Sequence, residues 1–413
     1  MPYDPHRAEA SILLADRHVG TMYYHGRETR FEYTDLDPRH PILGQSFETD
    51  PTRRRRARNG LPTWFANLLP EPGSGLRLLL EADMGEQRVH DFRLLVHIGA
   101  DLPGAVRVVP GEGCELVPAD DDEPRRAQTS ATGGLRFSLA GVQRKLSMVR
   151  QGRSLTLRAH GQDGHVLVKF QDGELDQVPQ NEFAMMQWAA ASGLSCASTE
   201  LKSRSDLEGL PEGLWASSET VLAVDRFDRG ADGTRVHQED FAQVWNVMPG
   251  QKYLEGDPYL SVRDDGNVRM GRLISQLCPP EDVIEFIRRL TSSVLMGNAD
   301  MHLKNWSLVY PGDRRVRLSP AYDLLCVTVY QRFNDRLAFP IGGQWDAERI
   351  GIEAFRRFGD QIEADPDLIA DAASETAHRM AESWPTVKST HPVPDFLARH
   401  VDERLAKHPL LIG

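Results

Sequence analysis

A stretch with almost no apolar side chains, ADDDEPRRAQTSATGG, occupies residues 119–134. Charged residues, Ser, Thr, Pro and Gly in this proportion cannot bury a core, so they are typical of a linker or an exposed loop. At 413 residues the chain is long enough for more than one core on the two sides of this stretch. We therefore predict a first unit at residues 1–118, a linker at 119–134, and a larger second unit from residue 135 to the end.

The pattern of apolar residues differs between the two units. Residues 10–109 alternate short strand-like runs with helical stretches, which predicts a small α+β unit. After the linker, strand-like runs that predict a twisted antiparallel sheet lie at 136–139, 145–149, 154–157 and 165–170. A helix is predicted from about residue 181 to 192 and a strand from 221 to 227, and helices are predicted to dominate after that. The second unit thus divides into a β-rich lobe, 135–227, and a helical lobe, 228–413.

The strongest helix signal lies between Pro280 and Gly297. The apolar residues that recur there at three- and four-residue steps are Val283, Phe286, Ile287, Leu290 and Val294. A Pro-Glu-Asp start followed by one apolar stripe is typical of an amphipathic helix that packs on a core. A β-rich lobe followed by a helical lobe, in an α+β protein, is the predicted fold.

Composition excludes several classes of function. Lysine plus arginine number 48 and aspartate plus glutamate 60, a formal charge of −12, which argues against a chain that coats nucleic acid or anionic membrane over its whole surface. The four cysteines form no CxxC pair, so neither a zinc site nor a disulfide framework is indicated. The start lacks the features of a signal peptide, and no run approaches the roughly 20 apolar residues of a membrane span. We expect a cytoplasmic protein without a membrane partner.

Candidate catalytic residues follow the predicted amphipathic helix. Asp300 and Asn305 are five residues apart, the spacing of the base and the metal-binding asparagine in a kinase catalytic loop. Asp323 comes 18 residues after Asn305 and could supply a second metal ligand, because Mg²⁺ prefers oxygen ligands. His302 and Lys304 would add cationic donors beside the phosphates. An Asp and an Asn at this spacing more often cap helices or form turns, but here they lie on a connection between packed elements, where sites concentrate.

A kinase also needs a lysine on a strand and a glutamate on the next helix to hold it. Lys169 lies in the apolar run Val166-Leu-Val-Lys169-Phe, and Glu182 begins the next helical stretch. An isolated strand lysine is more often an exposed edge residue. The order lysine, glutamate, catalytic loop and metal-binding aspartate favours the functional interpretation.

A longer series of motifs extends this pattern along the chain. In order they are Ser138-Leu-Ala-Gly-Val-Gln-Arg-Lys145, Val168-Lys169-Phe, Asn181-Glu182-Phe, Asp225-Arg-Phe-Asp-Arg229, Gln238-Glu-Asp-Phe, Gly297-Asn-Ala-Asp300-Met-His-Leu-Lys-Asn305 and Pro320-Ala-Tyr-Asp323. Together they resemble the HipA family of toxin serine/threonine kinases. Residues 61–71 and 91–99 resemble the amino-terminal subdomain of that family, so the resemblance spans nearly the whole chain. It implies a bilobal protein-kinase-like fold with an extra amino-terminal α+β subdomain.

The resemblance implies a role for each motif in an ATP- and Mg²⁺-dependent phosphotransferase. Asp300 would be the catalytic base, and Asn305 and Asp323 the magnesium ligands. The implied ATP-binding residues are Ala140, Gly141, Val142, Gln143, Arg144, Lys145, Lys169, Asp225, Arg226, Phe227, His302, Lys304 and Tyr322. Glu182 and Gln238 would support them. Ser138 would be an autophosphorylation site that ejects the phosphate-covering loop and silences the kinase; the alternative is a strand-end serine that caps a turn.

The resemblance also implies partners. A HipB-like helix-turn-helix antitoxin would neutralise the toxin and contact operator DNA, and a translation protein, such as an aminoacyl-tRNA synthetase, would be the substrate. The basic run Arg53–Arg58 could bind tRNA, DNA or an acidic protein, or it could be a solvated loop. A small-molecule or lipid kinase and a catalytically inactive co-repressor are the alternative functions. The amino-terminal unit argues against the first, and the complete set of catalytic residues against the second.

Overall fold

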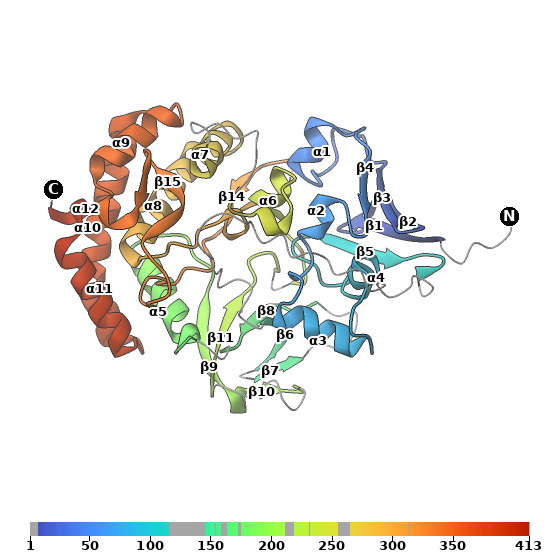
Figure 1. The fold of residues 1–413 in the computed structure, drawn as a ribbon, viewed down its shortest axis with the longest axis horizontal. Helices are drawn as coiled ribbons and strands as arrows, with labels where there is room; N and C mark the ends of the chain where they lie inside the picture. Colours follow the sequence, from blue (N-terminus) through green and yellow to red (C-terminus); the bar gives the residue numbers. More distant parts are fainter. Residues whose placement is uncertain are drawn as a thin grey trace.

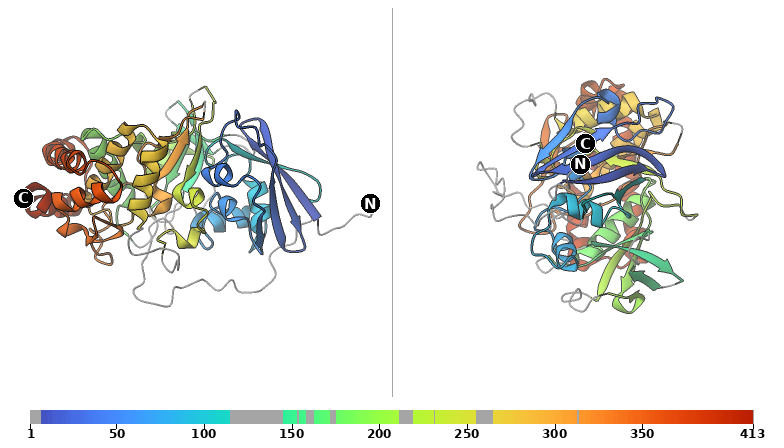
Figure 2. Two further views of the ribbon diagram at one scale, coloured as in Figure 1. Left: turned by 90° about the horizontal axis from the view of Figure 1, so that it is seen from above. Right: turned by 90° about the vertical axis from the view of Figure 1, so that its right-hand side faces the viewer.

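The computed structural model of the protein describes residues 7–114, 145–152, 154–157, 163–171, 175–210, 219–230, 232–254, 265–312 and 314–412. The predicted linker at 119–134, Ser138, and the five residues from Ala140 to Arg144 lie outside these ranges. The amino-terminal sheet and the last long helices lie at opposite ends of the molecule, with the rest of the chain between them (Figures 1 and 2).

The amino-terminal unit, residues 7–114, is built on an antiparallel sheet with the strand order β4-β3-β2-β1-β5. Its strands are β1 (Arg7–Leu14), β2 (Arg17–His25), β3 (Glu28–Tyr33), β4 (Arg55–Arg58) and β5 (Val106–Pro110). Every second residue of β1 is buried, as expected for a strand with one face on a core. The helices that complete this core are α1 (Gln45–Thr49), α2 (Thr63–Ala66), α3 (Gly75–Asp83) and α4 (Asp91–His97). The predicted α+β character of this unit is confirmed.

The basic run Arg53–Arg58 includes the edge strand β4, so the interpretation as a solvated loop is wrong for its second half. Arg55 is buried, with its guanidinium 3.9 Å from the centre of the Phe47 ring. It donates hydrogen bonds to the backbone oxygens of Ser46 at 2.8 Å and Asp50 at 3.1 Å. One arginine of the run therefore has a structural role, and the neighbouring arginines are exposed along the sheet edge.

The β-rich lobe is a six-stranded sheet with the order β10-β7-β6-β8-β11-β9. Its strands are β6 (Lys145–Gln151), β7 (Ser154–Leu157), β8 (Val166–Lys169), β9 (Thr199–Ser203), β10 (Leu207–Glu208) and β11 (Thr220–Asp225). The strands expected at 145–149, 154–157, 165–170 and 221–227 are confirmed; the run at 136–139 lies outside the described residues. The predicted strands pair antiparallel as expected, and β10, which was not predicted, adds a parallel pair with β7 at one edge. Helix α5 (Val178–Ala191) confirms the helix expected near 181–192.

The helical lobe contains several helices. They are α6 (Phe241–Val244), α7 (Gly266–Leu277), α8 (Pro280–Met296), α9 (Ile352–Gln361), α10 (Pro366–Thr390), α11 (Asp395–Lys407) and α12 (Pro409–Ile412). Of these, α7, α10 and α11 pack on α8. The periodic apolar residues of α8 are all buried, and Gly297 ends the helix with a left-handed φ of 69°. In the described part of the chain, no helix is both long enough and apolar enough to cross a membrane.

Short strands interrupt the helices of this lobe, although helices dominate it as expected. The strands are β12 (His237–Asp240), β13 (Ser307–Tyr310), β14 (Arg317–Leu318), β15 (Arg336–Ile341) and β16 (Gln344–Asp346). The 3-10 helices in the described residues include η3 (Arg204–Asp206), η4 (Pro249–Gln251), η5 (Leu303–Asn305) and η6 (Ala347–Arg349). Strand β13 begins directly after the predicted catalytic loop, and α6 lies beside α2 of the amino-terminal unit (Figure 1). Two to four paired residues are too few to give a reliable periodic signal in the sequence.

Candidate active site

Lys169, at the end of β8, connects two acidic residues from distant parts of the chain. Its Nζ lies 2.5 Å from Glu182 Oε1 on α5 and 2.6 Å from Asp323 Oδ1, in the loop after β14. Asp323 adopts a left-handed backbone conformation with φ 60°, which is uncommon for a residue other than Gly and costs about 1–2 kcal/mol. The fold thus brings together the strand lysine, the helix glutamate and the presumed metal-binding aspartate.

Opposing effects set the charges of this buried group. Burial alone would raise the pKa of Asp323, but Lys169 outweighs it and lowers that pKa to about 2. Burial alone would lower the pKa of Lys169, but Asp323 and Glu182 raise it above its ordinary value. Burial raises the pKa of Glu182 to about 7, although Lys169 acts in the opposite direction. At neutral pH the lysine and Asp323 are therefore both charged.

A second lysine faces the same side of the sheet. Lys145 in β6 is the direct cross-strand partner of Lys169 in β8, so the two side chains project from one face. Lys145 reaches solvent. Desolvation by the surrounding protein lowers the pKa of its ammonium group. Asp323 raises this pKa, whereas Lys169 and Lys304 lower it. Two lysines opposite each other repel unless an anion lies between them. This face of the sheet is suited to bind phosphate groups.

The predicted catalytic loop follows the glycine cap of α8. The backbone oxygen of Asp300 accepts hydrogen bonds from the side-chain Nδ2 of Asn305 at 2.9 Å and from the backbone N–H of His302 at 2.8 Å. The backbone N–H of Asp300 donates to Asn298 Oδ1 at 3.4 Å. The five-residue spacing of Asp300 and Asn305 therefore closes a compact loop. Because the amide NH₂ of Asn305 is used in this contact, its oxygen is the atom that could bind a cation.

Tyr253 is a residue of the site that sequence reasoning missed. Its hydroxyl donates a hydrogen bond to the Asp300 carboxylate. The adjacent Lys252 is buried, and its Nζ lies 2.8 Å from Glu71 Oε1 of the amino-terminal unit. No spacing or periodicity around Tyr253 points to this contact, because it depends on how the segment before α7 folds back onto the loop.

His302 is fully buried, and the expectation that it acts as a cationic donor is wrong. Burial lowers its pKa well below the ordinary value, and the nearby Lys252 lowers it further. Within the described residues neither ring nitrogen has a hydrogen-bond partner, and the ring contacts Tyr253 edge-on at a centroid distance of 5.2 Å. His302 is a neutral packing residue behind the loop.

Lys304 connects the loop to the amino-terminal unit. Its Nζ lies 2.8 Å from Asp240 Oδ2, 3.0 Å from the backbone oxygen of Asn67 and 3.1 Å from Asn67 Oδ1. These three acceptors hold the ammonium group in place. An ATP contact through Lys304 remains a proposal, whereas its structural role follows from these distances.

The segment expected to contact adenine follows β11. Asp225 ends the strand, and its carboxylate accepts a hydrogen bond from Arg150 at 2.7 Å. The ring of Phe227 lies 5.7 Å from that of Tyr322, the residue before Asp323. Tyr322 is fixed in turn, because its hydroxyl donates to the backbone oxygen of Lys304 at 3.0 Å. Two aromatic rings therefore connect the segment between the lobes with the loop that carries Asp323.

Two family models match the chain, and together they span most of it. A family model described as the HipA-like C-terminal domain matches residues 137–384, and one described as the HipA N-terminal domain matches residues 10–109. The chain belongs to the HipA family. The resemblance inferred from the motifs is confirmed.

Relatives and a solved structure agree with this membership. Y4dM of Sinorhizobium fredii, which is named as a kinase, is 38% identical over 375 residues that span 89% of this chain and 88% of its own. The serine/threonine-protein kinase toxin HipA of Shewanella oneidensis is 26% identical over 387 residues, 86% of this chain and 84% of its own. The HipA–HipB–operator DNA complex of Shewanella oneidensis MR-1 aligns with a TM-score of 0.72 at 21% identity and covers 96% of each chain. The predicted α+β, bilobal kinase-like fold is confirmed.

The oxygen donors of this HipA-family site suit a magnesium ion that is largely held by phosphate and water. Asp323 is ionised, and Asn305 can offer its amide oxygen. No group of three or more His, Cys, Asp or Glu residues that could hold a metal occurs within the described ranges. Mg²⁺ usually takes only one or two protein carboxylates together with substrate phosphates and waters, so this donor set is adequate.

Proposed function

We propose that this HipA-family protein is an ATP-dependent serine/threonine protein kinase. The observation that carries the proposal is the position of Lys169 Nζ, within 2.6 Å of both Glu182 and Asp323. A strand lysine that is held by a helix glutamate, next to a loop aspartate, is the arrangement that phosphoryl transfer from ATP requires. The kinase names of the relatives support the same conclusion.

In this mechanism the protein mainly positions the phosphates of ATP and removes the proton of the acceptor hydroxyl. Lys145 and Lys169 hold the phosphates. The oxygen of the acceptor hydroxyl bonds to the γ-phosphorus, and Asp300 accepts the proton of that hydroxyl. The bond from that phosphorus to the β–γ bridging oxygen breaks, and ADP leaves. Asn305 and Asp323 would hold Mg²⁺, which neutralises charge on the phosphates when bound.

The toxin role is also part of the proposal. We infer that the kinase inhibits growth by phosphorylating a serine of a translation protein of the aminoacyl-tRNA synthetase class, and that autophosphorylation of Ser138 silences it. A HipB-like helix-turn-helix antitoxin would neutralise it and provide most of the contact with operator DNA, as suggested by the named partners of the Shewanella relative. The cytoplasm is the proposed location, where the cysteines, which form no disulfide in the described residues, would stay reduced.

The test is transfer of labelled phosphate from ATP in the presence of Mg²⁺, with the protein alone and with a bacterial lysate. Asp300→Asn and Asp323→Asn should abolish label in protein. Asp282→Asn is the matched control, because Asp282 is a buried helical-lobe aspartate that pairs with Arg317 at 2.8 Å, away from Lys169. It should lower stability and retain transfer. ATP binding without transfer in the wild type would instead favour the inactive co-repressor, and label only in small molecules or lipids would favour the other alternative.

A further inference from the structure

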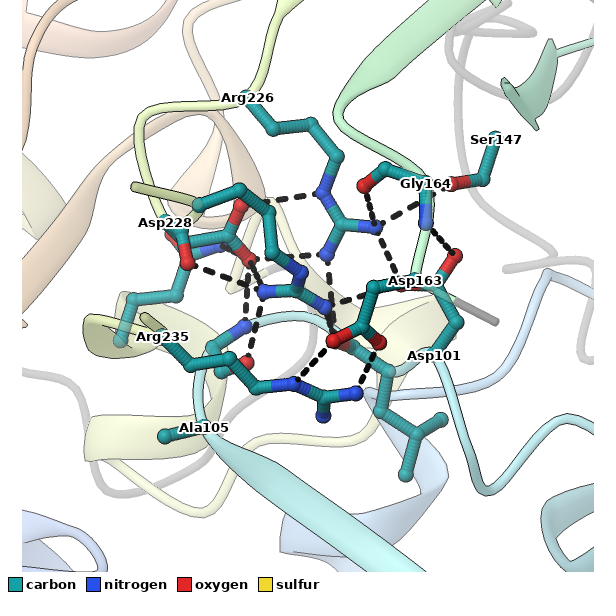
Figure 3. Close-up of polar contacts among 12 residues, drawn as sticks. Asp101, Ala105, Ser147, Asp163, Gly164, Arg226, Asp228 and Arg235 are labelled. Atoms are coloured by element: carbon teal, nitrogen blue, oxygen red, sulfur yellow. Dashed lines mark hydrogen bonds and ion pairs between the residues drawn. The ribbon is translucent and has the colours of Figure 1, made fainter. Parts of the chain in front are cut away.

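A cluster of arginines and aspartates surrounds the hinge segment, which we define as residues 225–229 (Figure 3). The members of this arginine–aspartate cluster are Arg226, Arg229, Arg235, Asp101, Asp163 and Asp228. Their formal charges balance. They come from the amino-terminal unit, from the β-rich lobe just before β8, and from the chain that leaves β11, so three parts of the molecule meet here.

Arg226 contacts all three parts with one guanidinium group. Its Nη1 lies 2.6 Å from Asp101 Oδ1 of the amino-terminal unit, and its Nε and Nη2 lie 3.0 and 2.9 Å from the carboxylate oxygens of Asp228. Nη1 also lies 3.3 Å from Ser147 Oγ and 3.4 Å from the backbone oxygen of Gly164 in the β-rich lobe. The position of the hinge segment is therefore tied to both neighbours.

Arg229 repeats the connection from the other end of the hinge segment. Its Nη2 lies 2.9 Å from Asp101 Oδ1, and its Nη1 lies 2.9 Å from the backbone oxygen of Gly104. The backbone N–H of Gly104 donates to Asp228 Oδ2 at 2.7 Å. Gly104 has φ 72°, and a Cβ there would lie 2.8 Å from the backbone nitrogen of Gln238. The loop between α4 and β5 thus approaches the backbone of β12 closely enough to require glycine, and the N–H of this glycine binds Asp228 of the hinge segment.

Burial makes this arrangement difficult to change. The side chains of Asp101 and Arg229 are 0% and 1% exposed. If the amino-terminal unit separated from the hinge segment, Arg226 and Arg229 would lose Asp101 and share Asp228. Unpaired buried charge is strongly unfavourable, so one relative position of the three parts is favoured.

We propose that the amino-terminal unit acts as a brace that fixes the hinge segment for ATP binding, with Asp101 as a positioning residue. The inference rests on the proposed function and on the expectation that Asp225, Arg226 and Phe227 bind ATP. Arg226 extends into the cluster, and the next residue, Phe227, contacts Tyr322 beside Asp323. The cluster therefore holds the hinge segment in place. Phe227 of this segment lies beside the loop that carries Asp323, the expected metal ligand.

The test compares Asp101→Asn with Asp91→Asn. Asp91 also belongs to the amino-terminal unit and accepts from Arg77 at 2.9 Å with 12% side-chain exposure, but it does not contact the hinge segment. Both substitutions should lower the thermal midpoint. Only Asp101→Asn should weaken ATP binding, by about tenfold in Kd, when calorimetric titration is done at a temperature where circular dichroism shows each variant folded. In phosphate transfer, KM for ATP should rise while kcat stays within about threefold.

A milder variant covers the case in which Asp101→Asn does not fold. Ser147→Ala removes one neutral contact to Arg226 and leaves every charge paired, so it should fold and raise the Kd for ATP by about twofold. If the folded variants bind ATP with the wild-type Kd, the cluster serves stability alone and the brace is refuted. Failure of the wild type to bind ATP is a separate result, which would refute the proposed function as well.

Discussion

The Tyr253 hydroxyl donates a hydrogen bond to the carboxylate of Asp300, the expected catalytic base. The residue before it, Lys252, pairs with Glu71 of the amino-terminal unit. Tyr253 therefore connects the group that would receive the acceptor proton with a part of the chain that lies far from it in the sequence. Hydrogen bonds to an ionised carboxylate orient it and stabilise its charge.

Tyr253→Phe should lower kcat by about 10- to 100-fold, because a hydrogen bond to a charged group contributes about 1.5–3 kcal/mol. The Kd for ATP should not change, since Tyr253 contacts Asp300 and not the lysines expected to bind phosphate. Steady-state kinetics with saturating ATP and a separate binding titration check both statements. A faster enzyme would show instead that the tyrosine competes with the acceptor hydroxyl for the base.

Lys169→Met should destabilise the fold as well as stop transfer. The substitution leaves the buried Glu182 and the partly exposed Asp323 without their cation, which costs about 3–5 kcal/mol in the free energy of unfolding. Lys202→Met in the same lobe is the control, because its partner Glu200 is 48% exposed and the loss should be about 1 kcal/mol or less. Chemical denaturation measures both values, and equal losses would argue against a tightly coupled group at Lys169.

Lys145→Met, in contrast to Lys169→Met, should weaken ATP binding with little effect on the stability of the fold. Lys145 is exposed and stands across from Lys169, so its removal relieves repulsion and should leave the free energy of unfolding within about 1 kcal/mol of the wild type. ATP binding should weaken, because one of the two cations on this face of the sheet is lost. Calorimetric titration with ATP tests this, and an unchanged Kd would exclude Lys145 from the phosphate site.

His237 should make stability depend on pH. It is buried, its Nε2 lies 2.8 Å from the backbone oxygen of Leu43, and burial lowers its pKa to about 4. A histidine whose folded pKa lies below the unfolded value gives full stability above about pH 6.5 and loses it as the pH falls toward 4. The loss should reach about 3 kcal/mol. Denaturation of wild type and His237→Gln between pH 4 and 8 should show a gap that changes over this range; a constant gap would contradict the assignment.

Much of the architecture could be predicted from local patterns. The apolar spacing in α8 located a helix that the structure confirms, and β6, β7 and β8 were found because each is a short strand-like run of the sequence. The motif order identified Lys169, Glu182 and Asp323 before their proximity was known. The strands and helices could be predicted because each rests on residues close together in the sequence, whereas the catalytic roles of the three site residues stay predictions.

The rest depended on contacts that no local pattern encodes. Asp101 and Arg226 are separated by 125 residues, so nothing near either one indicates that they pair. The neutral state of His302 follows from burial, which its motif does not reveal. Tyr253 could be connected to Asp300 only once the segment before α7 was placed.

The contacts of Lys252 with Glu71 and of Lys304 with Asn67 set a limit on how the protein can be divided. A shortened chain that starts at the β-rich lobe would leave Lys304 of the predicted catalytic loop with Asp240 but without Asn67, and the buried Lys252 would lose its carboxylate. The two kinase lobes alone are therefore not a smaller version of the enzyme. Domain swaps between relatives should exchange the amino-terminal unit together with residues 225–254 and the loop from 298 to 305.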